Sequence, residues 1–159
     1  MTVLKKLVGQ TAIYGLSSIV GRLLNFLLVP LYTSVFTTGE YGTLSVLMTV
    51  VAFSMVVLTF GFETAFFHYT NKEKNPSKVL STAFVFLTSS ALLFLAIVIP
   101  SADSIANILH VSEHTVFIKY LAWILVFDVI TTLPFAKLRV DDKPWRFALI
   151  RIVNIIVNI

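Results

Sequence analysis

The segment Tyr41–Phe62, YGTLSVLMTVVAFSMVVLTFGF, contains no charged residue and lies between Glu40 and Glu63. A helix needs about 20 residues to cross the hydrocarbon core of a bilayer, because each residue adds about 1.5 Å. The strands of a membrane barrel would alternate apolar and polar residues, and this segment shows no such alternation. The segment therefore predicts a transmembrane α-helix and, with it, an integral membrane fold.

The composition of the whole chain agrees with this prediction. Hydrophobic residues make up 57% and charged residues only 13% of its 159 residues, whereas soluble domains average about 25% charged residues. Cysteine is absent, which excludes disulfides and thiol chemistry. The net charge of +4 is explained by basic loops of a membrane protein, so nucleic acid is not expected as a partner.

Charge-poor windows along the chain predict an all-α, polytopic membrane helix bundle. The expected transmembrane helices cover about residues 9–36, 41–67, 79–100, 116–136 and 145–159, the last of them incomplete. The chain stops inside the fifth apolar window. We therefore expect residues 1–159 to be the N-terminal lobe fragment of a longer protein, with a complete small protein as the alternative.

Basic residues gather in the N-terminal segment and in every second loop. They are Lys5 and Lys6, then Lys72, Lys74 and Lys78, and then Lys137, Arg139, Lys143 and Arg146. Loops rich in Lys and Arg stay in the cytoplasm. The distribution predicts a cytoplasmic N-terminus and a multi-pass protein of the cytoplasmic membrane.

The first predicted helix carries a polar face inside the membrane. At about 100° per residue, Tyr14, Ser18, Arg22 and Asn25 fall within about 80° of one another on a helical wheel. Lipid cannot hydrogen-bond such groups, so the face should look toward protein or water. The planar fork of donors on an arginine suits phosphate, which makes Arg22 the candidate for an anionic ligand in a lined cavity.

Two acidic residues also lie inside predicted helices. Glu63 is near the inner end of the second helix, and Asp128 lies within the fourth. They could set the electrostatics of a cavity or carry a proton. They could equally form a buried ion pair with Arg22 that only ties helices together. The sequence leaves both interpretations open.

Signatures of enzymes and of metal sites are missing from the sequence. It contains no Walker loop, no GxGxxG and no HExxH motif. His68, His110 and His114 are scattered over predicted loops and are interpreted as surface histidines. We therefore expect no cofactor, no metal and no enzymatic activity.

Three short pieces of sequence stand in a distinctive order. They are VPLY at Val29–Tyr32, EYG at Glu40–Gly42 and GFETA at Gly61–Ala65. With the alternating basic loops, they resemble the N-terminal part of Wzx-like polysaccharide flippases. These proteins form the polysaccharide transporter branch of the superfamily of multidrug, oligosaccharidyl-lipid and polysaccharide exporters.

The resemblance implies a two-lobed transporter with a central cavity in the bacterial inner membrane. Such a protein flips undecaprenyl-diphosphate-linked oligosaccharide across the cytoplasmic membrane by alternating access. Arg22 would hold the diphosphate, with Tyr14, Ser18, Asn25, Glu63 and Asp128 as further cavity residues. The implied partners are the lipid-linked oligosaccharide, membrane lipid, a coupling proton or sodium ion, and polysaccharide assembly proteins.

Other functions stay open at this point. A multidrug exporter of the same superfamily, coupled to sodium or protons, would show a drug phenotype without a glycan defect. A membrane enzyme of envelope assembly would need a large outer loop with catalytic side chains, and the predicted outer loops are short. A non-transporting membrane scaffold is the third alternative.

Overall fold

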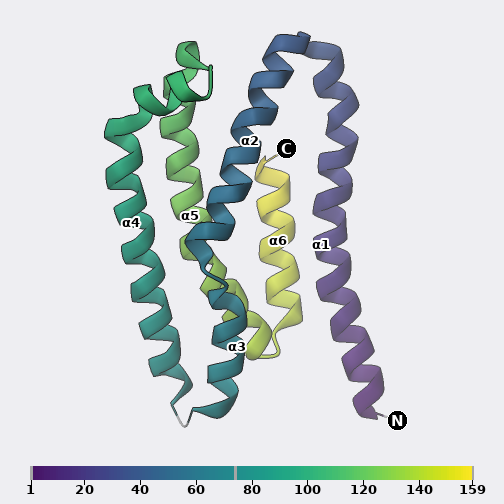
Figure 1. Cartoon of the computed structure of the whole chain (residues 1–159). Coiled ribbons are helices and arrows are strands. Elements are labelled where there is room, and N and C mark those ends of the chain that lie inside the picture. The colour runs from purple at the N-terminus through teal and green to yellow at the C-terminus, as the bar shows by residue number, and fades with distance from the viewer. Residues whose placement is uncertain (1, 74, 159) are drawn as a thin grey trace. The chain divides into compact units, whose positions relative to one another are not determined.

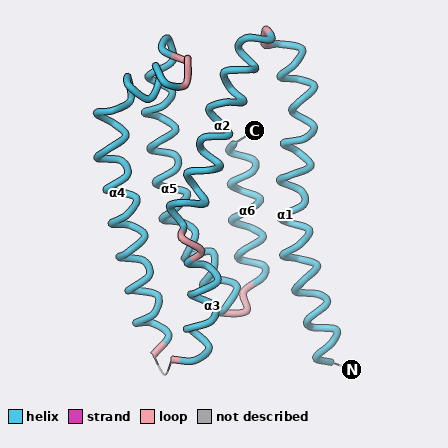
Figure 2. Tube along the Cα trace, viewed as in Figure 1, coloured by secondary structure: helices cyan, strands magenta, loops and turns pink. Residues whose placement is uncertain are grey.

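A computed structural model describes residues 2–73 and 75–158, with side chains described for residues 14–16, 19–20, 23–24, 26–73 and 75–156. Within these ranges the chain is helical apart from short loops (Figure 1 and Figure 2), so the predicted all-α class is confirmed. The helices are α1 (Thr2–Val35), α2 (Thr38–Thr59), α3 (Phe62–Lys72), α4 (Pro76–Ile108), the 3₁₀ turn η1 (Ser112–His114), α5 (Thr115–Val140) and α6 (Pro144–Asn158).

The chain divides into two compact units. One unit comprises residues 1–38 and 137–159, which include α1 and α6, and the other comprises residues 39–136. In the second unit, α3 and α4 pack against each other as a hairpin. In the first unit, α1 and α6 lie side by side and run in the same direction (Figure 1).

The core of unit 39–136 is built from small and branched residues at helical spacing. Along α4 the buried positions recur every four or seven residues, at Ala83, Leu87, Ala91, Leu95, Ala102 and Ala106. Along α5 they are Ile118, Ala122, Leu125, Val126, Val129, Leu133 and Ala136. Alanine at these points lets neighbouring helices approach closely, which is how membrane helices pack when no water drives them together.

The outer surface of the helices exposes many large apolar side chains. Phe53 and Val56 on α2, Leu93 on α4 and Phe127 on α5 are each more than half exposed. Three helical stretches among the described residues are long and apolar enough to cross a membrane: Thr38–Lys72, Pro76–Ile108 and Ser112–Val140. An apolar exterior of this extent fits a lipid environment.

The second predicted helix, over 41–67, is interrupted in the structure. Phe60 and Gly61 adopt left-handed backbone angles, with φ of 48° and 65°, between the end of α2 and the start of α3. The rings of Phe60 and Phe62 both pack on Phe86 of α4, at 5.7 Å and 4.8 Å between centroids. These contacts hold the break against α4.

Two further helix ends use the same backbone conformation. At the end of α4, His110 has a φ of 56°, and the backbone N–H of Val111 donates to the carbonyl of Ala106. At the end of α5, Asp142 has a φ of 56°, and the N–H of Lys143 donates to the carbonyl of Leu138. Each is a Schellman cap, which satisfies carbonyl groups that the helix itself leaves free.

The helix bounds can be compared with the predicted transmembrane segments. Each of the segments 9–36, 79–100, 116–136 and 145–159 overlaps one helix, and 41–67 overlaps α2 and α3 together. α4 is longer than its predicted segment, because it continues through Pro100 to Ile108. The position of each helix in the bilayer stays a prediction, and so does the orientation that places the N-terminus in the cytoplasm.

Candidate functional site

The polar face predicted for the first helix lies on one uninterrupted helix. α1 runs from Thr2 to Val35 and includes Pro30, so the spacing between Tyr14 and Asn25 is that of a continuous helix. The side chains of Ser18, Arg22 and Asn25 lie outside the described residues. Of the four residues of this face, Tyr14 is the one whose side-chain contacts the structure describes.

Tyr14 faces α6. Its ring meets the ring of Phe147 edge to face, at 5.1 Å between centroids and an interplanar angle of 78°. Phe147 is 1% exposed, and the guanidinium carbon of Arg139 lies 5.0 Å from the centre of its ring. An edge-to-face pair and a cation over a ring are both favourable, so these three side chains form a fixed junction of α1, α6 and the end of α5.

α6 carries a polar face that begins at this junction. Arg151 and Asn154 follow Phe147 by four and seven residues, which places the three positions within about 60° on the helix. We call the line along which the two helices face each other the α1–α6 seam. Counted by helical spacing from the contact of Tyr14 with Phe147, it comprises the positions of Tyr14, Ser18, Arg22 and Asn25 on α1, and of Phe147, Arg151 and Asn154 on α6.

The height of the two arginines along the seam follows from the helix rise. Arg151 lies about 6 Å beyond Phe147, and Arg22 about 12 Å beyond Tyr14. Because α1 and α6 run in the same direction and Tyr14 contacts Phe147, the two arginine positions differ in height by about one helical turn. The seam therefore brings two arginine positions to neighbouring levels.

Burial changes along the seam. Phe147 and Ala148 are buried at its lower end, whereas Arg151 and Asn154 are exposed. Within the described ranges, Arg151 makes no hydrogen bond and no ion pair. A cation on an apolar helix without a neighbouring anion is costly in a membrane, which points to a ligand or to water.

Sequence reasoning missed Arg151 and Phe147 as site residues. Arg151 is a single charge inside the fifth apolar window, and an aromatic residue four positions before it carries no signal of its own. The spacing of Phe147, Arg151 and Asn154 at helical intervals was the pattern that could have identified the face.

The two predicted acids belong to unit 39–136. Glu63 lies in the first turn of α3, directly after the break at Phe60–Gly61, and is half-buried. An acid is stabilised there by the positive end of the helix dipole. Asp128 lies in the middle of α5, and its backbone carbonyl accepts hydrogen bonds from the hydroxyls of Thr131 and Thr132, both at 3.0 Å. The side chain of Arg22 lies outside the described residues, so its pairing with either acid stays a prediction.

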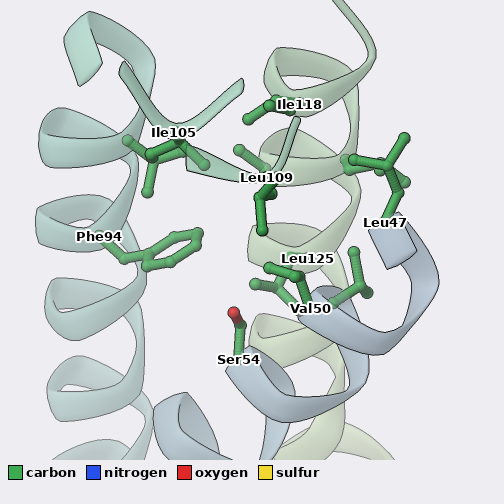
Figure 3. Close-up of a pocket in the computed structure, with 12 residues that line it drawn as sticks. Leu47, Val50, Ser54, Phe94, Ile105, Leu109, Ile118 and Leu125 are labelled. Carbon is green, nitrogen blue, oxygen red and sulfur yellow. The ribbon is translucent and has the colours of Figure 1, made fainter. Parts of the chain in front are cut away.

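An apolar cavity lies between α2, α4 and α5 (Figure 3). Its volume is about 140 Å³, and its walls include Leu47, Val50, Phe94 and Leu125. Ser54 is the polar residue of this lining, and its hydroxyl points into the cavity. An apolar lining of this kind favours apolar groups. It does not suit a sugar or a phosphate.

The histidines and acids form no metal site in the part of the chain that the structure describes. His110 caps α4, and His114 packs its ring against Phe117 at 5.5 Å. His68 packs against Tyr69 at the far end of α3. His68 and His110 are exposed, as predicted for surface histidines, whereas His114 is half-buried.

A comparison with protein families matches the model described as "Polysaccharide biosynthesis protein" to residues 18–159. The chain belongs to this family. The match includes Arg22 and Arg151 and agrees with the resemblance to Wzx-like flippases. No curated protein and no solved structure matches the chain. Family and apolar helices together make this a membrane protein of polysaccharide biosynthesis, of a transporter type.

Proposed function

We propose that this polysaccharide biosynthesis protein flips an undecaprenyl-diphosphate-linked oligosaccharide across the cytoplasmic membrane by alternating access. The observation that carries the proposal is the α1–α6 seam. The seam contains the positions of two arginines, Arg22 and Arg151. The side chain of Arg151 has no anionic neighbour among the described residues.

Two arginines suit a diphosphate better than one. Each guanidinium presents a planar fork that can form two parallel hydrogen bonds to phosphate oxygens. A difference in height of about one helical turn lies within the reach of two flexible arginine side chains. Arg22 and Arg151 would thus bind the diphosphate, while the amides of Asn25 and Asn154 and the hydroxyl of Ser18 would offer hydrogen bonds to the first sugar.

The aromatic junction would close one end of this site. Tyr14, Phe147 and Arg139 pack together where the basic loops are predicted to face the cytoplasm. A closed junction below an open polar seam is one of the two arrangements that alternating access requires. The headgroup would reach the seam from the cytoplasmic side when α6 moves away from α1.

Glu63 and Asp128 supply a means of ion coupling in this proposal. Both are acids on apolar helices, where a proton or a sodium ion would neutralise the charge. Glu63 adjoins the break between α2 and α3, where movement of α3 would change the environment of its carboxylate. Polysaccharide assembly proteins would supply the lipid-linked substrate and take up the product.

The test is glycan export in the organism that makes this protein. We expect Arg22→Gln and Arg151→Gln each to reduce surface glycan at least tenfold, because each loses a charge-assisted pair worth about 1.5–3 kcal/mol. Arg146→Gln on the same helix, outside the seam, should export normally. Normal export by stably inserted Arg22→Gln and Arg151→Gln proteins would overturn the proposal. Loss of drug resistance with intact glycan would favour a multidrug exporter.

A further inference from the structure

A second cavity lies between α3 and α4, at the hairpin that joins them. Its volume is about 530 Å³, and it is an open groove within unit 39–136. Phe62, Phe66 and Ala83 line the end of the groove that lies away from the connection between α3 and α4. Phe66 and Ala83 are 3% and 5% exposed, so this part of the groove has a solid apolar floor.

The other end of the groove is polar. Tyr69, Asn75 and Lys78 line it where α3 ends and α4 begins, and Glu73 lies on the same rim. Among the described residues Lys78 makes no ion pair, with Glu73 included. Three lysines and one glutamate lie between residues 72 and 78, so the rim is basic. The positive end of the long α4 dipole adds to this charge.

The two ends are separated along the helix axis. From Phe62 to Tyr69, α3 rises about 10 Å. The groove thus has an aromatic end and a cationic end. The distance between them matches the distance from the upper acyl chains to the headgroups within one leaflet of a membrane. Tyrosine is common at this level of a membrane protein because one end of its side chain is apolar and the other polar.

We propose that this groove binds one anionic phospholipid of the leaflet next to the hairpin. Its phosphate would accept hydrogen bonds from Lys78 and the Asn75 side chain, and the first part of one acyl chain would lie over Phe62 and Phe66. Charge complementarity and the graded lining both select this occupant over a soluble anion, which would leave the aromatic floor empty. The inference does not depend on what the protein transports.

A bound lipid would hold α3 against α4. α3 follows the backbone break at Phe60–Gly61, and in this unit its principal helix neighbour is α4. A lipid that contacts both helices would therefore restrict the movement of α3, and with it the position of Glu63 in its first turn. The composition of the membrane would in this way regulate the segment around the break.

The test compares lipids in the purified full chain. The protein is placed in nanodiscs that contain both phosphatidylglycerol and phosphatidylcholine. Native mass spectrometry then counts how many lipids of each kind stay bound to the protein. We expect phosphatidylglycerol to be preferred about tenfold, the value of one charge-assisted contact, and Lys78→Gln to lose most of this preference. Lys72→Gln, at the last residue of α3 and outside the groove lining, should retain it.

A second pair of variants tests the apolar part without changing charge. Thr82→Phe places a ring in the groove and should lower lipid retention, whereas Val85→Phe on the exposed side of α4 should not. Equal losses in Lys72→Gln and Lys78→Gln would show diffuse attraction to the loop and overturn the proposal. Displacement of phosphatidylglycerol by an isoprenyl diphosphate at equal concentration would also overturn it, because the groove would then belong to the substrate path.

Discussion

The ring of Tyr14 on α1 meets the ring of Phe147 on α6 edge to face, with 5.1 Å between their centroids. This contact aligns two helices whose polar faces would otherwise have no fixed relation. It also places the exposed Arg151 on the face of α6 that turns toward α1. The seam, and the function proposed for it, depend on this pair.

The energetic coupling of the pair can be measured in a double-mutant cycle. Edge-to-face pairs contribute about 0.5–1.5 kcal/mol beyond the area that they bury. We expect Tyr14→Ala and Phe147→Leu to be coupled by about 1 kcal/mol in the free energy of unfolding, measured by denaturant titration in detergent. A control cycle of Tyr14→Ala with Trp145→Leu, an exposed residue of α6, should show no coupling. Additive effects in the first cycle would contradict the contact.

Gly61 and Gly42 should respond to alanine in opposite directions. Gly61 has a φ of 65° and no neighbouring atom within 4 Å of an added Cβ, so backbone strain alone opposes the substitution. Gly61→Ala should destabilise the protein by about 1 kcal/mol. Gly42 lies in α2 with equally open surroundings, and Gly42→Ala should stabilise it by about 0.5–1 kcal/mol. The same sign for both would show that residue 61 is helical in solution.

His110 occupies a position that favours glycine. It has a φ of 56° at the end of α4, where the chain closes a Schellman cap. His110→Gly should raise the free energy of unfolding by about 0.5 kcal/mol, because relief of the left-handed strain exceeds the entropy lost. Ser104→Gly, inside α4, should instead lower it by about 0.5 kcal/mol, the difference in helix propensity between the two residues. A loss in His110→Gly would mean that its imidazole makes a stabilising contact.

The apolar cavity should accept additional side-chain volume. The cavity is partly open, so filling it recovers only part of the about 24 cal/mol per Å³ that enclosed core cavities cost. Ser54→Leu fills part of the space and removes an inward hydroxyl, so we expect about 1 kcal/mol of stabilisation in thermal unfolding. Ser89→Leu, on the exposed side of α4, is the control and should give no gain. Destabilisation by Ser54→Leu would indicate that the cavity is already occupied.

The sequence predicted the helical architecture well because charge-free windows report directly on helices that avoid water. It could not predict the break at Phe60–Gly61, since the window stays apolar across it and a single glycine is compatible with a continuous helix. The packing of Phe60 and Phe62 on Phe86 depends on α4, which lies a hairpin away in the chain.

The candidate site was predicted only in part. Intramembrane polarity identified the face of α1 from Tyr14 to Asn25, because polar groups are rare there. Which helix this face meets could not be read from one sequence. Among the described side chains, the contact of Tyr14 with Phe147 identifies α6, and so adds Arg151 and Asn154 to the site.

The central claim is tested most directly by flipping in reconstituted vesicles. The protein as its cell makes it is reconstituted with a fluorescent isoprenyl-diphosphate oligosaccharide, and headgroup access to a membrane-impermeant quencher is followed over time. We predict that Arg151→Gln lowers the initial rate at least tenfold, since a lost charge-assisted pair costs about 1.5–3 kcal/mol, while Arg146→Gln keeps the wild-type rate. A wild-type rate in Arg151→Gln would contradict the account.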